Sequence, residues 1–377
     1  MKRAKITLVL LVAIALCALA PSARAAETKP EARPLIQMAI LLDTSGSMSG
    51  LISQAKTELW KVVNGFATTK KDSRIPRLEV ALYEYGHSPL GGNQMRMIVP
   101  LSTDLDRISE ELFALKTSGG NEYCGMVIDK ATEELEWSES NENLKVIFIA
   151  GNEPFIQGPV DYREACKAAI SRGIMINTIH CGSEAQGISG KWKDGATLAD
   201  GSYSFIDQNR QVVHVEAPQD DKIAELGRRL NETYIAYGAK GREAKVRQEA
   251  QDANAAKMKG SGAAVQRQVT KANAQYVNTG WDLVDAVQND KVKLEEVEEE
   301  ALPEEMREMS AEERRAFVEK NAARRAEIQK KINALNAERK KYVARKRKEM
   351  SEGDQETLGE ALSAALREQA ARKGFEN

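Results

Sequence analysis

A carboxylate and two hydroxyl groups occur at alternate positions early in the chain, in Asp43, Ser45 and Ser47. Each supplies a hard oxygen atom, the kind of ligand that Mg²⁺ and Mn²⁺ prefer in proteins. The pattern therefore predicts a site for Mg²⁺ or Mn²⁺. The same residue types also suit a helix N-cap, which is a second interpretation. An aspartic-protease Asp-Thr-Gly fits less well, because Ser45 interrupts it and no second copy occurs.

The elements on either side of this cluster place it at the end of a strand. An apolar run over 38–42 is typical of a buried parallel strand, and from Ser53 onward apolar residues recur at three- and four-residue steps, as in a helix. The cluster thus lies on a strand-to-helix loop at the carboxyl end of a strand. Open α/β sheets bind their ligands at that edge.

Strand and helix patterns then alternate along the chain, which predicts a doubly wound α/β fold with a mostly parallel sheet. Two of the strands, 77–85 and 95–101, are close enough in sequence to pair as an antiparallel edge. The other expected strands cover 144–150, 174–180 and 202–206, and the expected helices cover 51–67, 104–115, 125–137, 161–172 and 220–232.

Over roughly residues 35–235 the sequence resembles the von Willebrand factor A (vWA) domain, whose Rossmann-like fold carries a metal-ion-dependent adhesion site (MIDAS). In that family the site begins with Asp-x-Ser-x-Ser after the first strand, as in 43–47 here. The resemblance implies that the two serine hydroxyls bind the ion directly and that Asp43 helps through water. It also implies a non-catalytic module that binds proteins, with an acidic residue of the partner completing the ion's coordination.

The later loops of the site depart from the family's residue types. Asn121, 78 residues after Asp43, stands where the family has Thr, and Gly151 stands where it has a second Asp. The triplet Gly-Asn-Glu occurs at both loops, at 120–122 and 151–153. We expect Asn121 and Glu153 to complete the metal site with a carbonyl oxygen and a carboxylate. The alternative is that these residues cap helices and that the metal site has been lost.

Catalytic patterns are not evident in the sequence. His87, His180 and His214 show no nucleophile–base spacing, and there is no P-loop lysine and no Cys-x-x-Cys. The sequence therefore favours a non-enzymatic protein.

Three cysteines follow the N-terminal segment, namely Cys124, Cys166 and Cys181. Cys124 begins an expected helix and Cys181 ends an expected strand at the same sheet edge as the metal loops. Cys166 falls within the helix expected over 161–172. A disulfide between Cys124 and Cys181 is thus the favoured pairing, while the other pairings stay open.

The N-terminus has the pattern of an export signal. Basic residues at 2–5 precede an apolar stretch over 6–20, and Ala-Arg-Ala at 23–25 fits a small-x-small cleavage site. We expect a signal peptide over 1–25, cleavage near Ala25, and a periplasmic or secreted mature protein.

The composition changes beyond residue 239. The stretch 239–265 is rich in Gly, Ala, Lys and Gln, which predicts a linker or a loosely held helix. The stretch 264–290 regains apolar residues, which predicts a helical segment. Together, 239–290 are expected to be a linker and helical segment. From 291 to 377 we expect a charged helical tail with a thin, coiled-coil-like apolar stripe. Residues 294–313 carry ten acidic side chains and one basic, whereas 314–348 carry fourteen basic and three acidic.

Charge limits the classes of partner. With 54 Lys and Arg against 56 Asp and Glu, the net charge of −2 gives no bulk attraction to nucleic acid. The basic block of the tail suits an acidic protein, the anionic membrane surface or the acidic block itself. The first hypothesis is therefore a metal-assisted protein-binding (adhesion or assembly) module of the cell envelope. The alternative is a metal-free structural scaffold whose helical tail makes the contacts, and an envelope enzyme comes third.

Overall fold

The strands pair side by side into one sheet, in the order β3-β2-β1-β4-β5-β6. Each neighbouring pair is parallel except β2 with β3, which is antiparallel. The computed structural model describes residues 33–66, 69–87, 94–209, 214–350 and 357–376. The strands of this described part are β1 (Leu35–Asp43), β2 (Arg77–Tyr85), β3 (Met95–Ser102), β4 (Leu144–Gly151), β5 (Met175–Cys181) and β6 (Tyr203–Ile206).

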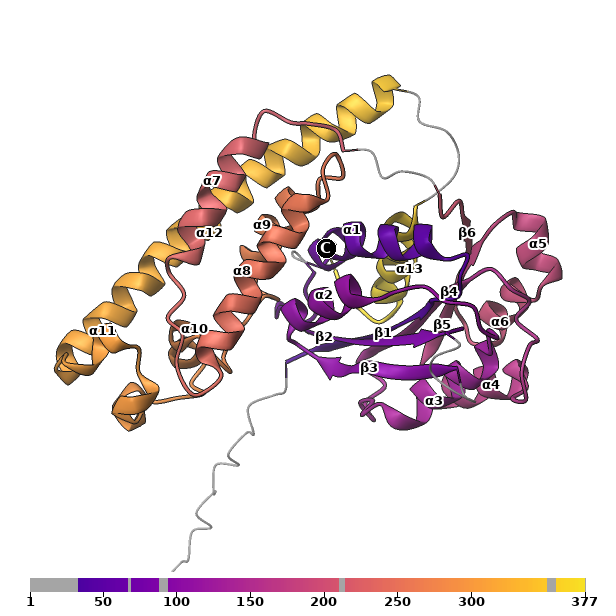
Figure 1. Cartoon of the computed structure of the whole chain (residues 1–377), viewed down its shortest axis with the longest axis horizontal. Helices are drawn as coiled ribbons and strands as arrows, with labels where there is room; N and C mark the ends of the chain where they lie inside the picture. The colour runs from indigo at the N-terminus through magenta and orange to yellow at the C-terminus, as the bar shows by residue number, and fades with distance from the viewer. Residues whose placement is uncertain (1–32, 67–68, 88–93, 210–213, 351–356, 377) are drawn as a thin grey trace, which may run out of the picture. The chain divides into compact units, whose positions relative to one another are not determined.

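Helices cover both faces of the sheet (Figure 1). α1, α2 and α13 share one apolar cluster with one face, and α3, α4 and the Trp192 end of α6 share another with the opposite face. The helices up to β6 are α1 (Ser49–Asn64), α2 (Leu105–Ala114), α3 (Cys124–Glu134), α4 (Tyr162–Ser171), α5 (Glu184–Ser189) and α6 (Trp192–Leu198). The predicted doubly wound, mostly parallel α/β fold is confirmed.

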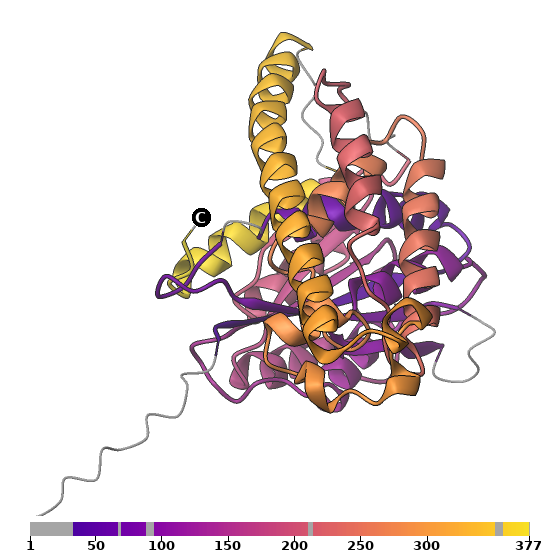
Figure 2. The same ribbon diagram turned by 90° about the vertical axis from the view of Figure 1, so that its left-hand side faces the viewer.

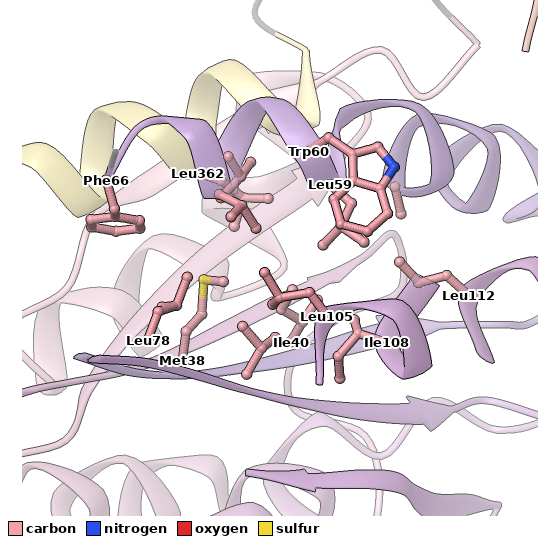
Figure 3. Close-up of a cluster of buried hydrophobic side chains, with 14 of the residues drawn as sticks. Met38, Ile40, Leu59, Trp60, Phe66, Leu78, Leu105, Ile108, Leu112 and Leu362 are labelled. Carbon is pink, nitrogen blue, oxygen red and sulfur yellow. The ribbon is translucent and has the colours of Figure 1, made fainter. Parts of the chain in front are cut away.

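The alternation of side chains along β1 explains why this strand lies at the centre. All nine of its residues are buried, because Met38 and Ile40 point into one helical layer and Ala39 and Leu41 into the other. Figure 3 shows the first of these layers, where side chains of α1, α2 and α13 meet those of β1 and β2. A central strand of this kind holds its carboxyl end, at Asp43, in a fixed position.

A second set of helices follows β6 and packs on α1 and α2 rather than forming a separate unit. Residues 33–377 are one compact unit, without a boundary near residue 239. Figure 2 shows the long α12 from another side, and α12 packs along α7. These elements are α7 (Asp220–Asn231), α8 (Gly241–Lys257), α9 (Ala263–Lys271), α10 (Leu283–Gln288), the 3₁₀ turns η2 (Leu294–Glu296) and η3 (Glu299–Ala301), α11 (Glu304–Arg307), α12 (Ala311–Met350) and α13 (Leu358–Arg372).

The stretch 239–265, expected to be a linker or a loosely held helix, contains the helix α8, which packs against α2 and α9. Its buried face consists of small and polar side chains such as Ala244, Gln248 and Gln251, so it has no apolar stripe that the sequence could show. Gln251 accepts a hydrogen bond from Ser109 of α2 at 2.8 Å, and Gln248 donates one to Tyr276 at 3.0 Å. Hydrogen bonds therefore replace apolar contact along this helix.

Two groups of ionised side chains are buried among these helices. In the first, Arg267 and Lys271 of α9 meet Asp252 of α8 and Asp106 of α2. In the second, Arg325 of α12 binds both Asp282 and Asp285, with N–O distances of 2.6 Å. These ion pairs join different helices. They therefore hold the helices after β6 together and attach them to α2, which covers one face of the sheet.

The last helix, α13, returns to the sheet and closes one of its faces. Gln369 and Asn177 of β5 exchange hydrogen bonds of 2.6 and 3.0 Å. After the helix, Glu376 pairs with Lys70 through two backbone hydrogen bonds of 2.7 Å. The charged tail expected over 291–377 thus ends in a segment that belongs to the core of the sheet.

The signal peptide predicted over 1–25 lies outside the described residues. Among the helices of the described part, none combines the length and the apolar character needed to cross a bilayer.

Candidate functional site

Three loops meet at the carboxyl edge of β1, β2 and β4. The first begins at Asp43, whose Oδ1 accepts a hydrogen bond of 2.7 Å from the backbone N–H of Ser45. The backbone N–H of Thr44 donates to the carbonyl of Tyr85, and the N–H of Ser118 donates to the carbonyl of Thr44. These bonds fix the first loop to the end of β2 and to the second loop.

The second loop contributes Glu122, which the sequence analysis did not select. Its side chain is buried beside Asp43 and Ser45. The three side chains crowd around Gly86, which has a φ of +77°. A Cβ atom there would lie 2.8 Å from Asp43 Oδ1, 2.9 Å from Glu122 Cγ and 3.4 Å from Ser45 Cβ. Glycine is therefore needed at 86 for both its backbone conformation and its lack of a side chain.

The third loop contributes Asn152, directly after β4. Its amide nitrogen donates a long hydrogen bond, 3.4 Å, to the hydroxyl of Ser47, which is exposed. The backbone of Asn152 also approaches the carboxylate of Asp43. Both Gly-Asn-Glu triplets thus contact the first loop. The first triplet does so through Glu122 and the second through Asn152.

The arrangement leaves buried oxygen atoms without hydrogen-bond partners. Asp43 Oδ2, Ser45 Oγ, Glu122 Oε2 and Asn152 Oδ1 are all hidden from solvent and have no such partner in the described part of the chain. Burying a polar atom without a partner costs free energy, so such a cluster calls for an additional ligand. Hard oxygen atoms from carboxylate, hydroxyl and amide groups fit a Mg²⁺ or Mn²⁺ ion.

The number of carboxylates in this set is small. Within the described residues there is no group of three or more His, Cys, Asp and Glu side chains that could hold a metal ion. A cation here would depend on the two carboxylates of Asp43 and Glu122 together with the neutral oxygen atoms. Such a donor set leaves more of the ion's charge for a further acidic ligand.

Burial and mutual repulsion disfavour ionisation of both carboxyl groups at once. Burial raises the pKa of Asp43, although the hydrogen bond from the backbone N–H of Ser45 opposes the change. Burial also raises the pKa of Glu122, and the neighbouring Asp43 raises it further. Two carboxyl groups with raised pKa values at one buried point are typical of a functional site.

The two other ligands expected from the sequence, Asn121 and Glu153, have hydrogen-bond partners outside the cluster, although the Glu153 carboxylate is near enough to raise the pKa of Glu122. Asn121 is exposed, and its amide donates a 3.0 Å hydrogen bond to the hydroxyl of Tyr123. The Glu153 carboxylate accepts a 3.2 Å hydrogen bond from Gln157. Their participation in metal binding stays a prediction from the sequence, whereas Glu122 and Asn152 are the members of the two triplets that contact the first loop. The repeated Gly-Asn-Glu triplet is the sequence feature from which Glu122 and Asn152 could have been predicted as site residues, because each triplet contains both an Asn and a Glu.

A side chain at Gly151, where the resemblance to the vWA domain placed the second Asp, would collide with another side chain. The Tyr85 hydroxyl crosses from β2 and donates a 3.0 Å hydrogen bond to the carbonyl of Ala150. A Cβ atom on Gly151 would lie 2.4 Å from this hydroxyl and 3.0 Å from Asp43 Oδ2. The position therefore cannot carry any side chain while Tyr85 keeps its place.

This steric relation gives a direct test. We expect Gly151→Ala to lower the free energy of unfolding by about 1–3 kcal/mol, as overpacking does elsewhere. In a Tyr85→Phe background, which removes the crowding hydroxyl, the same substitution should cost clearly less. Urea unfolding of the four proteins in this double-mutant cycle measures the coupling. Equal costs in both backgrounds would show that Tyr85 does not occupy the space.

The expected disulfide between Cys124 and Cys181 is not present. Cys124, Cys166 and Cys181 are all buried and free. The two residues of the expected pair lie on opposite faces of the sheet, since Cys124 packs in the layer of α3 and α4, whereas Cys181 packs in the layer of α1. The sequence places both cysteines at one edge of the sheet but does not show which face of the sheet each of them occupies.

Residues 37–191, from β1 to the start of α6, match the family model of the von Willebrand factor type A domain. Among curated proteins, none matches the chain.

Several solved structures resemble part of the chain. The conserved hypothetical protein BatB from Bacteroides thetaiotaomicron is 16% identical, with a TM-score of 0.35, over 46% of this chain and 90% of that one. The SpRpn10 VWA domain is 18% identical, with a TM-score of 0.34, over 45% of this chain and 86% of that one. An aerotolerance-related membrane protein from Bacteroides fragilis is 14% identical, with a TM-score of 0.32, over 46% and 93% respectively.

Proposed function

We propose that this protein is a non-catalytic, divalent-metal-assisted protein-binding module of the cell envelope. Domains of the matched type generally mediate contacts between proteins. The observation that carries the metal-dependent part is the set of four buried, unpartnered oxygen atoms on three loops. Asp43, Ser45, Ser47, Glu122 and Asn152 are the residues that would hold Mg²⁺ or Mn²⁺. When bound, the ion would offer an open coordination position to an acidic residue of the partner.

The residues of this chain prepare the site in two ways. The backbone hydrogen bonds of Thr44 and Ser118 hold the loops together before any ion arrives, so little ordering is needed on binding. Ser47 and Asn152, which are not fully buried, mark the side from which a partner would approach. The low number of carboxylates explains why an acidic partner group would be favoured there.

Metal binding is tested first by removing the central carboxylate. We expect the wild-type protein to bind Mn²⁺ in isothermal titration calorimetry and Asp43→Ala to show no binding at millimolar metal, with its circular dichroism spectrum unchanged. Two further variants then show whether Glu122 or Glu153 supplies the second carboxylate. Glu122→Gln should weaken Mn²⁺ binding about tenfold or more, which is about 1.4 kcal/mol, whereas Glu153→Gln should change it little.

The reverse order of effects would restore Glu153, the residue expected from the sequence, as the ligand and exclude Glu122. Absence of any binding by the wild type would reject the metal-dependent function. Partner capture from envelope extract, with and without EDTA, then distinguishes the two functional classes. Capture that EDTA abolishes supports the metal-assisted module, whereas EDTA-resistant capture supports the metal-free scaffold.

Export to the envelope is part of the proposal and is supported by the signal-like pattern over residues 1–25. The basic block of α12 leaves Lys340, Lys341 and Arg345 exposed, a surface suited to an acidic protein or an anionic membrane. N-terminal sequencing of the protein from a periplasmic fraction should give a mature chain that begins near Ala26.

A further inference from the structure

A cavity of about 820 Å³ lies away from the loops at Asp43, where α1, α12 and α13 come together. α1 and α13 pack side by side (Figure 1), and the last turns of α12 form a wall of the cavity. Its volume falls within the usual range of small-molecule sites. The site proposed above uses none of the residues that line it.

The lining of this cavity has two chemical parts. Its apolar part comes from side chains that are not fully buried, such as Val343 and Ala344 of α12 and Ala364 of α13. Its charged part is predominantly cationic. Five Lys and Arg side chains line the cavity, against two carboxylates; these are Lys61, Arg339, Lys340, Arg347 and Arg367, and Glu58 and Glu360.

Both carboxylates already have partners. Glu58 is buried and accepts hydrogen bonds from the Thr357 hydroxyl and the N–H of Gly359, at the start of α13. Glu360 lies 3.7 Å from Lys61 Nζ and 3.5 Å from Arg347 Nη1. Little negative charge therefore remains to neutralise the cations.

The cationic side chains of the cavity differ in how many hydrogen-bond and ion-pair partners they have. Arg339 is paired with Asp220 at 2.6 Å. Arg347 has only the long contact to Glu360, and its Nε is hidden from solvent with no hydrogen-bond partner in the described part of the chain. Within the described residues, the side chain of Arg367 donates only to the backbone carbonyl of Ser363. An anionic group bound between Arg347 and Arg367 would supply the missing acceptor.

We infer that this cavity binds an amphiphilic organic anion, that is, a carboxylate, phosphate or sulfonate group attached to an apolar body. The charged group would meet Arg347, while the apolar body would lie against Val343, Ala344 and Ala364. Neither a bare inorganic anion nor a neutral apolar molecule would use both parts of the lining. The inference is independent of the metal-dependent function.

The test uses the full-length mature protein and 8-anilinonaphthalene-1-sulfonate as the probe. We expect fluorescence titration to show one saturable site, from which decanoate displaces the probe. Decyltrimethylammonium, which has the same alkyl chain and the opposite charge, should displace it at least tenfold less well. Equal displacement by the two surfactants, or no saturable binding by the folded protein, would overturn the inference.

Two substitutions locate the site. Arg347→Glu should weaken probe binding about tenfold or more, because a charge-assisted hydrogen bond is replaced by repulsion. Arg345→Glu is the matched control on the same helix, since Arg345 is exposed and does not line the cavity; it should change binding less than twofold.

The second substitution, Ala364→Trp, should block the cavity by volume, and Ala323→Trp on the exposed face of α12 is its control. If Arg347→Glu fails to fold, this pair alone decides the question. Probe binding that survives both cavity variants unchanged would place the probe elsewhere and reject the cavity as its site.

Discussion

Replacing Asp252 with asparagine is expected to lower the free energy of unfolding by about 3–5 kcal/mol, one of the largest single effects in this protein. The Asp252 carboxylate lies 2.8 Å from Arg267 Nε and 2.5 Å from Lys271 Nζ. Both cations are fully buried, with exposures of 0%. The substitution leaves Lys271 without a carboxylate and Arg267 with Asp106 alone.

The neighbours of the two cations show why the loss cannot be repaired by water. Arg267 stacks over the ring of Trp60 from α1 at 4.5 Å and is bound by Asp106 from α2. The Tyr276 hydroxyl donates to the same Asp106 at 2.6 Å. A cation enclosed in this way must be paired, because the interior solvates it poorly. Urea unfolding followed by circular dichroism measures the effect.

Acid sensitivity provides an independent readout of the same group. Burial alone would raise the pKa of Asp252, but Lys271 and Arg267 reverse this and lower it to about 2. A carboxyl pKa that is lower in the folded state stabilises the protein above the unfolded value and loses this contribution as pH falls. We therefore expect about 2 kcal/mol of wild-type stability to disappear between about pH 4 and pH 2, and this part to be absent in Asp252→Asn.

Glu249→Gln is the matched control, since it removes an exposed carboxylate from the same helix α8. It should change the free energy of unfolding by less than about 0.5 kcal/mol. A comparable loss in both variants would mean that net charge, rather than the buried ion pairs, produces the effect.

The buried ion pairs also explain where prediction from sequence stops. The sheet and its flanking helices were predictable because apolar periodicity specifies them, as in the fully buried run 38–42. The packing of α8 and α9 was not, because Arg267 and Lys271 look like ordinary surface residues until their partners are known. One partner, Asp106, comes from α2, which is far from α9 in sequence, and the other, Asp252, comes from the neighbouring helix α8.

The candidate site shows a similar limit. Asp43, Ser45 and Ser47 follow from local spacing on one loop, and the structure places them on one loop at the end of β1. The contributions of the other loops depend on which member of each Gly-Asn-Glu triplet turns inward. That choice is set by Tyr85 and Gly86, which lie on β2 and just beyond it. No short-range pattern contains this information.

The apolar pattern of the last helix, α13, is present in the sequence but follows a strongly charged stretch. Leu358, Leu362 and Leu366 recur every four residues in α13 and are all buried against the sheet layer. Small residues between them, such as Ala361 and Ala365, complete the apolar face. The strongly charged stretch before residue 350 made the entire tail look solvated, although its last twenty residues have a core-facing pattern.

We expect Leu366→Ala to lower the free energy of unfolding by about 2–5 kcal/mol, as other large-to-small core substitutions do. Leu366 is 1% exposed and belongs to the same cluster as Leu59 of α1 and Phe148 of β4. The cavity left behind would also weaken the docking of α13. Limited proteolysis should therefore cleave the variant faster than the wild type around residues 357–376, before the remainder of the chain.

The matched control is Ser363→Ala, one helical turn earlier. The Ser363 side chain is only partly buried and donates to the carbonyl of Gly359 within its own helix, so its loss should cost less than about 1 kcal/mol. If Leu366→Ala were as mild as this control, α13 would be an appendage on the sheet and not part of its core. A large loss together with early cleavage near α13 would show that the vWA-like sheet needs the C-terminal end of the chain to close its second face.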